Sequence, residues 1–146
     1  EMKMNNSSVD ILSSKSSSEI LERAFDDMMT IAEEELWVSV EFIHGFNSFW
    51  CATPEEEMVD DEVVGIIDIG DDLPMNEKLG ALAHEVGHCL HHMHKQFSPV
   101  QDVMFSESIA WFLGYNWFFD KGIIINMSEY QKQMANALEL YRMELG

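Results

Sequence analysis

The spacing of apolar residues divides the chain into one helix, three short strands and three further helices. From Ser18 to Ala32 the apolar residues recur every three or four positions, which is the period of one helix face. The segment from Trp37 to Ile43 alternates in polarity, as a strand with one exposed face does. Residues 46–52 and 63–69 are rich in aromatic or β-branched side chains, so they predict two more strands.

Three helical segments follow these strands, and their approximate bounds are 75–97, 101–119 and 128–145. Pro74 stands near the first turn of the first segment, where proline is tolerated. Helices that follow a run of strands predict an α+β fold, and the short consecutive strands favour a mostly antiparallel sheet.

The composition is that of one folded domain. The chain has 146 residues, 47% of them hydrophobic, and this length suits a single core. Residues 1–17 are polar and serine-rich without any period, so we expect a flexible segment there and one domain over residues 18–146. No apolar run approaches the roughly 18 residues that span a bilayer, so we expect no membrane contact. The two cysteines and the lack of a signal peptide favour a cytoplasmic protein.

The net charge of −19 is large and unevenly placed. No Lys or Arg stands between Arg23 and Lys78, while that stretch carries 16 acidic residues. The charge repels phosphate groups, which excludes direct binding of nucleic acid as the expected function. Either the protein has a basic protein or peptide as its partner or substrate, or the charge only keeps the surface solvated.

Residues 84–88 read H-E-V-G-H, which is the zinc-hydrolase pattern H-E-x-x-H, in the first of the three later helices. His84 and His88 are four residues apart and share a helix face, so both imidazoles can bind one zinc ion. Glu85 can reach a water at an open zinc position as a general base. Gly87 costs a helix about 1 kcal/mol relative to Ala, so its presence predicts that another backbone passes close by.

A catalytic zinc ion usually has three protein ligands and a water, so a third ligand is needed. Glu107 is a lone carboxylate on an otherwise apolar helix, and its burial is costly unless it is paired or binds a metal. His94 is the alternative, because it completes the spacing H-E-x-x-H-x-x-x-x-x-H. That arrangement needs a sharp helix end, which Gly provides, but His91 occupies the position.

Several other polar residues are candidates for supporting roles. His92 shares the face of His84, but at about 1.5 Å per residue it lies some 12 Å away, too far to share an ion. We expect His92 to support the site or bind substrate. A second oxyanion donor is expected from His92, Tyr115 or His44, with core packing as the alternative for Tyr115. A carboxylate is expected to orient a ligand histidine, and the candidates are Asp68, Asp71, Asp72 and Asp102.

Two stretches resemble the signature of the ImmA/IrrE-type zinc metallopeptidases, which is H-E-[LI]-G-H-x-x-L-H followed by E-x-x-A-N. Residues 84–92 read H-E-V-G-H-C-L-H-H, and residues 107–111 read E-S-I-A-W, so Trp111 replaces the Asn. The likeness covers roughly residues 18–119. It implies a small zincin-like domain of the gluzincin kind, with two His ligands on one helix and a Glu on the next. It also implies that the strand before the metal helix, 65–69, is an edge where a substrate strand pairs.

We therefore predict a zinc-dependent metallopeptidase that hydrolyses a protein substrate. One zinc ion per chain is expected on His84, His88 and Glu107, with Glu85 as the general base. The alternatives are a zinc-containing protein that cuts nothing, and an acidic protein that mimics nucleic acid and binds a basic partner. A structural zinc site has four protein ligands and needs no catalytic carboxylate, so Glu85 favours the enzyme.

Overall fold

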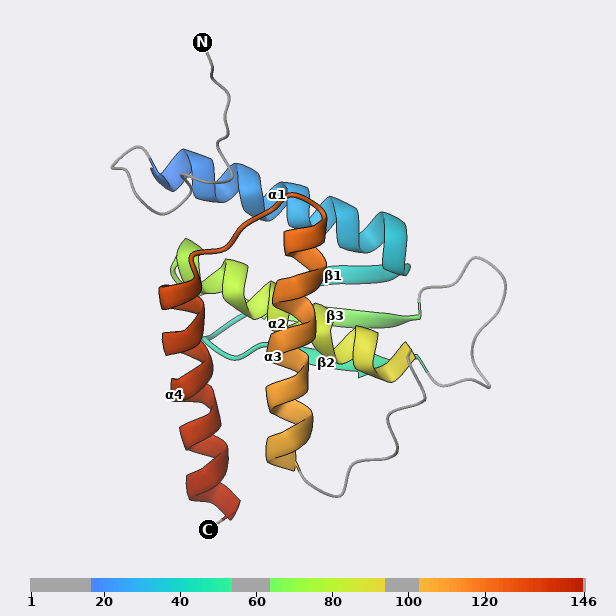
Figure 1. The fold of residues 1–146 in the computed structure, drawn as a ribbon. Coiled ribbons are helices and arrows are strands. Elements are labelled where there is room, and N and C mark those ends of the chain that lie inside the picture. Colours follow the sequence, from blue (N-terminus) through green and yellow to red (C-terminus); the bar gives the residue numbers. More distant parts are fainter. Residues whose placement is uncertain (1–16, 54–63, 94–102, 146) are drawn as a thin grey trace.

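The computed structural model describes residues 17–53, 64–93 and 103–145 and forms the α+β fold that the sequence predicts (Figure 1). The flexible segment predicted at residues 1–17 lies outside these ranges except for Ser17, where the first helix begins. Among the described helices, none has the length and apolar character needed to cross a membrane. The elements are α1 (Ser17–Leu36), β1 (Val38–Ile43), β2 (Phe49–Ala52), β3 (Gly65–Gly70), α2 (Met75–Met93), α3 (Val103–Asp120) and α4 (Met127–Leu145).

The sheet has the strand order β1-β3-β2 and is mixed. β1 pairs with β3 in parallel, and β2 pairs with β3 antiparallel. The expected antiparallel pairing is therefore found for β2 but not for β1. The physical reason is that β3 carries Ile67 and Ile69, which are fully buried, and such a strand is most stable in the centre. β3 is therefore not an edge strand, which corrects the role that the resemblance implied for residues 65–69.

The junction between α1 and β1 differs slightly from the sequence prediction. Trp37 has a φ of 59°, in the left-handed region, and ends α1 instead of starting the strand. Its carbonyl oxygen accepts a hydrogen bond of 2.7 Å from the backbone N–H of Val64. The backbone N–H of Val40 in β1 donates a hydrogen bond of 3.0 Å to the carboxylate of Glu33 in α1. This bond connects the helix directly to the strand.

Helix α2 lies at the centre of the fold, with contacts to α1, to the sheet and to α3 (Figure 1). Its apolar side chains Leu79, Leu82 and Val86 are fully buried. Met28 of α1 and Ile67 of β3 belong to the same buried cluster. The core therefore surrounds α2, which gives the helix that carries the histidines a rigid setting.

Helices α2 and α3 approach each other at two glycines. A Cβ on Gly87 would lie 1.7 Å from the carbonyl oxygen of Ala110, and one on Gly114 would lie 1.7 Å from that of Ala83. No side chain fits at such distances, so each glycine admits the backbone of the facing helix. The prediction from Gly87 that another backbone passes close to the metal helix is confirmed, and that backbone belongs to α3.

Substitution of Gly114 tests this contact without changing a residue of the H-E-x-x-H motif. We expect Gly114→Ala to lower the free energy of unfolding by at least about 2 kcal/mol, because the methyl group forces α2 and α3 apart. Urea unfolding followed by circular dichroism measures it. Asn116→Ala, at an exposed position of α3, is the control and should leave the midpoint within experimental error. Equal midpoints for Gly114→Ala and the wild type would contradict the close packing.

Candidate metal centre

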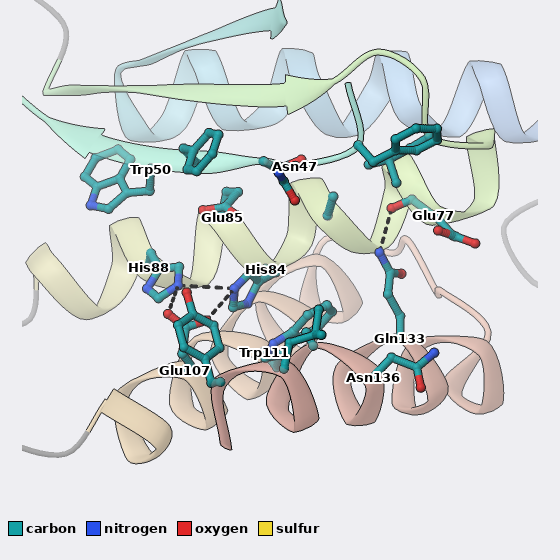
Figure 2. A pocket seen from close by; sticks show the side chains of 18 residues that line it. Asn47, Trp50, Glu77, His84, Glu85, His88, Glu107, Trp111, Gln133 and Asn136 are labelled. Carbon is teal, nitrogen blue, oxygen red and sulfur yellow. Dashed lines mark hydrogen bonds and ion pairs between the residues drawn. The ribbon is translucent and has the colours of Figure 1, made fainter. Parts of the chain in front are cut away.

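Three side chains from α2 and α3 converge at the contact between these helices. The Nε2 atoms of His84 and His88 lie 3.2 Å apart. Glu107 places Oε1 at 3.0 Å from His84 Nε2 and Oε2 at 3.1 Å from His88 Nε2. The carboxylate thus bridges the two imidazoles, as Figure 2 shows. The structure brings together the three residues that the sequence proposed as ligands.

The geometry of this group fits a metal ion better than a set of hydrogen bonds. Both Nε2 atoms can donate to Glu107 only if both carry protons, and two N–H groups then face each other at 3.2 Å. Ligand atoms placed about 2.0–2.1 Å from a tetrahedral zinc ion are about 3.3 Å apart, close to the distances observed here. Two imidazoles and a carboxylate also form a donor set that zinc and related divalent metals accept.

The electrostatics of the group favour ionised Glu107. Burial raises the pKa of its carboxyl group, but the hydrogen bonds to His84 and His88 outweigh burial and lower the pKa to about 2. Burial lowers the pKa of His84, and the hydrogen bond to Glu107 offsets this only in part. Burial lowers the pKa of His88 as well. The hydrogen bond to Glu107 and the charges of Glu85 and Glu107 outweigh burial, so the pKa of His88 is raised overall. A metal ion would displace the remaining proton.

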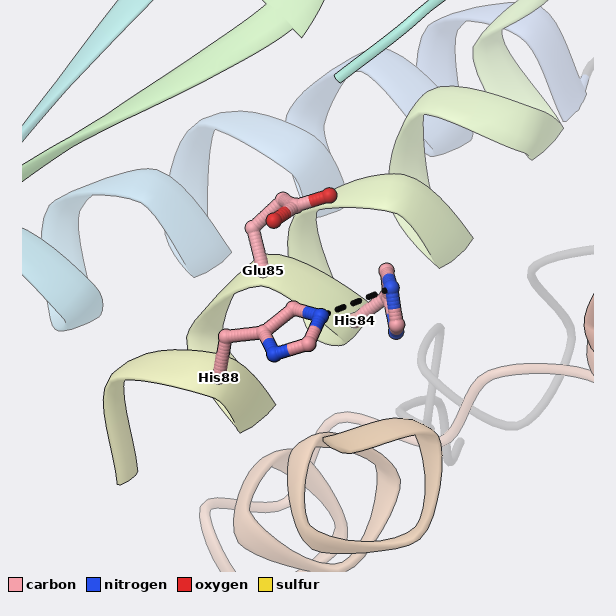
Figure 3. A group of neighbouring side chains, drawn as sticks. All are labelled: His84, Glu85 and His88. Atoms are coloured by element: carbon pink, nitrogen blue, oxygen red, sulfur yellow. Dashed lines mark hydrogen bonds between the residues drawn. The ribbon is translucent and has the colours of Figure 1, made fainter. Parts of the chain in front are cut away.

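Glu85 lies beside the two histidines on α2 but points to a different side of the helix (Figure 3). A carboxylate oxygen of Glu85 and one nitrogen of each histidine lie within 4.8 Å of one another. Its side chain is 4% exposed, and burial raises its pKa to about 8, with Glu107 adding to the rise and His88 opposing it. A buried carboxyl group with such a pKa exchanges protons near neutral pH.

Trp111 packs directly on His84. The rings of Trp111 and His84 are stacked with centroids 4.2 Å apart. Tyr130 of α4 meets the same indole edge-on, and its hydroxyl donates a hydrogen bond to the carbonyl oxygen of Trp111. Sequence reasoning noted Trp111 only as a departure from the family signature. Its position four residues after Glu107, on the same helix face, is the feature of the sequence that could have placed Trp111 at the site.

The group opens into a cleft of about 630 Å³ (Figure 2). Asn47 and Trp50 lie on the wall near β2, and Gln133 and Asn136 lie on the wall formed by α4. Sequence analysis did not predict the α4 wall. Its lining residues have the spacing of one helix face, which is the signal that could have found it, and they are Gln133, Asn136, Ala137, Leu140 and Tyr141.

The candidates His92, Tyr115 and His44 do not line this cleft, although His92 lies next to Trp50, which does. His92 is exposed and its ring centre is 6.0 Å from that of Trp50, while Tyr115 packs against Phe119 and Tyr130. His44 is exposed and does not line the cleft. The alternative ligand His94 and the carboxylate of Asp102 lie outside the described residues.

The carboxylate expected to orient a histidine of the site is not found at Nδ1 of His84 among the described residues. His84 Nδ1 is buried without a hydrogen-bond partner in this part of the chain, as is the indole nitrogen of Trp111. Asp71 pairs with Lys78 at 3.2 Å, and Asp72 accepts a bond from the backbone N–H of Gly45. These two carboxylates are engaged at the start of α2, far along the helix from the histidines.

Comparisons with known proteins do not identify the chain. No family model, no curated protein and no solved structure matches it. The resemblance to the ImmA/IrrE-type metallopeptidases thus stays a prediction. The structure itself shows a His-Glu-x-x-His group on α2 that can bind a metal ion.

Removal of Glu107 tests the assignment of the ligands. We expect Glu107→Ala to weaken zinc binding at least about 100-fold, because two imidazoles alone leave half of the tetrahedral coordination to water. Competition with a chromophoric chelator measures the affinity. Glu22→Ala, at an exposed position of α1, removes the same charge elsewhere and should leave the affinity unchanged. Equal affinities of Glu107→Ala and Glu22→Ala would place the third ligand on another residue.

Proposed function

We propose that this protein is a zinc-dependent metallopeptidase of the ImmA/IrrE type. The observation that carries the proposal is the placement of a buried carboxylate, Glu85, beside two imidazoles and a second carboxylate at the base of an open cleft. A site that only stabilises the fold has four protein ligands and no need for an additional buried carboxylate. The site has the parts that peptide hydrolysis requires.

Each part has a separate chemical task. His84, His88 and Glu107 would hold the ion, since the two Nε2 atoms and the carboxylate oxygens already lie 3.0–3.2 Å from one another. A zinc ion bound there would supply Lewis acidity, which lowers the pKa of a water and polarises the carbonyl group of a peptide. Trp111 fixes the plane of the His84 ring by stacking on it.

Glu85 is the proton carrier in this proposal. Its carboxylate takes the proton of the attacking water and later delivers it to the leaving amine nitrogen. Burial raises its pKa to about 8, and a cation held nearby would bring the pKa down toward neutrality. A group with a pKa near the ambient pH can both accept and release a proton within one cycle.

The cleft suits an extended peptide. Its wall near β2 belongs to an edge strand, because among the described strands β2 pairs with β3 alone, and a peptide can add to such an edge by backbone hydrogen bonds. The role that the resemblance implied for residues 65–69 is thus proposed for β2. Phe46, Phe49 and Leu140 are exposed at the cleft and offer apolar contacts to side chains of the substrate. The net charge of −19 favours a basic substrate.

The variant Glu85→Gln separates catalysis from metal binding. We expect it to retain about one zinc ion per chain and to cleave peptides about 10²–10⁴ times more slowly, since the amide cannot accept the proton. Cleavage of a mixed peptide library, followed by mass spectrometry, and metal analysis of the same samples measure both quantities.

Glu77→Gln is the matched control, because Glu77 lines the same cleft about two helical turns before His84. It removes one carboxylate and should leave the rate within a few-fold of the wild type. Wild-type protein loaded with zinc that cuts no peptide of the library, or Glu85→Gln that cuts as fast as the wild type, would refute the proposal.

A further inference from the structure

The cleft runs along one face of α2, from the two histidines to Gln133 of α4. The residues of α2 that line it have the spacing of one helix face, and they are Glu77, Ala81, His84, Glu85 and His88. Between Glu77 and His88 this face is about 16 Å long, at 1.5 Å per residue. Figure 2 shows His88 and Glu107 at one end of the cleft and Glu77 with Gln133 at the other. Gln133 is therefore remote from the reacting atoms.

The side chain of Gln133 is seated on α2. Its Nε2 atom donates a hydrogen bond of 3.0 Å to the backbone carbonyl oxygen of Glu77. A Cβ on Gly80 would lie 2.0 Å from Oε1 of Gln133, and the three atoms nearest to such a Cβ all belong to Gln133. Glycine weakens the interior of a helix, and at position 80 it leaves the space that the amide occupies. Both helices therefore contribute to the seat of this amide.

The seated amide lies where two cavities meet. A second cavity of about 180 Å³ lies between the starts of α2 and α4. Glu77, Gln133 and Asn136 line both this cavity and the cleft of about 630 Å³. The other residues that line the second cavity are Asn76, Ile125, Glu129, Tyr130 and Lys132. A cavity of about 150 Å³ can hold a benzene ring, so the second cavity is large enough for an aromatic side chain.

We propose that Gln133 determines which substrate side chains bind at this end of the cleft, a role that rests on the proposed peptidase activity. Its amide keeps the second cavity closed to the cleft, so small side chains fit against it and aromatic ones do not. Glu77 is seven residues before His84, about 10 Å along α2. An extended peptide advances about 3.3 Å per residue, so the third residue from a scissile bond at the histidines reaches the amide.

The seat of the amide is tested by a double-mutant cycle that needs no assay of activity. In the Gln133→Ala background the space beside Gly80 is vacant, and Ala is the better helix former. We therefore expect Gly80→Ala to raise the urea midpoint clearly more in that background than in the wild type, where the methyl group expels the amide. Equal changes of the midpoint in the two backgrounds would show that the amide does not occupy this space, and would overturn the proposal.

The selectivity of Gln133→Ala tests the role in substrate recognition. The probes are pairs of peptides derived from one that the wild type cuts, with Ala or Phe at the third residue before or after the cleaved bond. We expect Gln133→Ala to raise the ratio of kcat/KM for the Phe peptide to that for the Ala peptide at least about ten-fold at one of these two positions, because the ring enters the second cavity. The affinity for zinc should stay unchanged, since Gln133 is remote from the metal centre.

Gln131→Ala is the matched control, because Gln131 is exposed on the same helix and lines neither cavity. It should leave the ratio unchanged. A loss of activity in Gln133→Ala that is equal for both peptides of each pair would indicate a purely structural role and overturn the proposal, as would unchanged activity on every peptide. In both cases the peptidase activity itself would stand. A zinc-loaded wild type that cuts no peptide would instead refute that activity, and the role of Gln133 with it.

Discussion

The close contact between α2 and α3 is the constraint on which the site depends. Gly87 and Gly114 leave no side chain between the two backbones, so α3 lies near enough for the short side chain of Glu107 to reach both histidines. With larger residues at these positions, the carboxylate would lie further from the imidazoles than a shared ion allows. The helix contact therefore determines which residues can act as ligands.

The same contact buries charged groups, and a bound cation would offset the cost. His84, Glu85 and Glu107 are all buried, and an apolar setting is unfavourable for charged groups. The bridge from Glu107 to the imidazoles compensates part of this cost, but Glu85 has no cationic partner other than His88 among the described residues. Buried carboxyl groups of this kind lower the stability of the fold and are typical of positions that serve chemistry.

Local features of the site could be predicted from the sequence, and features formed by distant segments could not. The helical spacing of His84 and His88, and the passing backbone inferred from Gly87, follow from residues within one helix. Glu107 could be proposed because a lone carboxylate on an apolar helix needs a partner. The central position of β3 was missed, because strand order depends on which strands pair across the chain. The stacking of Trp111 on His84 was missed for the same reason, since it needs the packing of α3 on α2.

The most direct test of the central claim is the set of atoms around a bound metal. X-ray absorption at the zinc edge, on protein loaded with one equivalent of zinc, reports the number of imidazole and oxygen ligands. The account predicts two imidazoles, with oxygen ligands at about 2.0–2.2 Å, and a loss of one oxygen ligand or its replacement by water in Glu107→Gln. Three imidazoles, unchanged in Glu107→Gln, would contradict it and would assign the third position to a histidine such as His94.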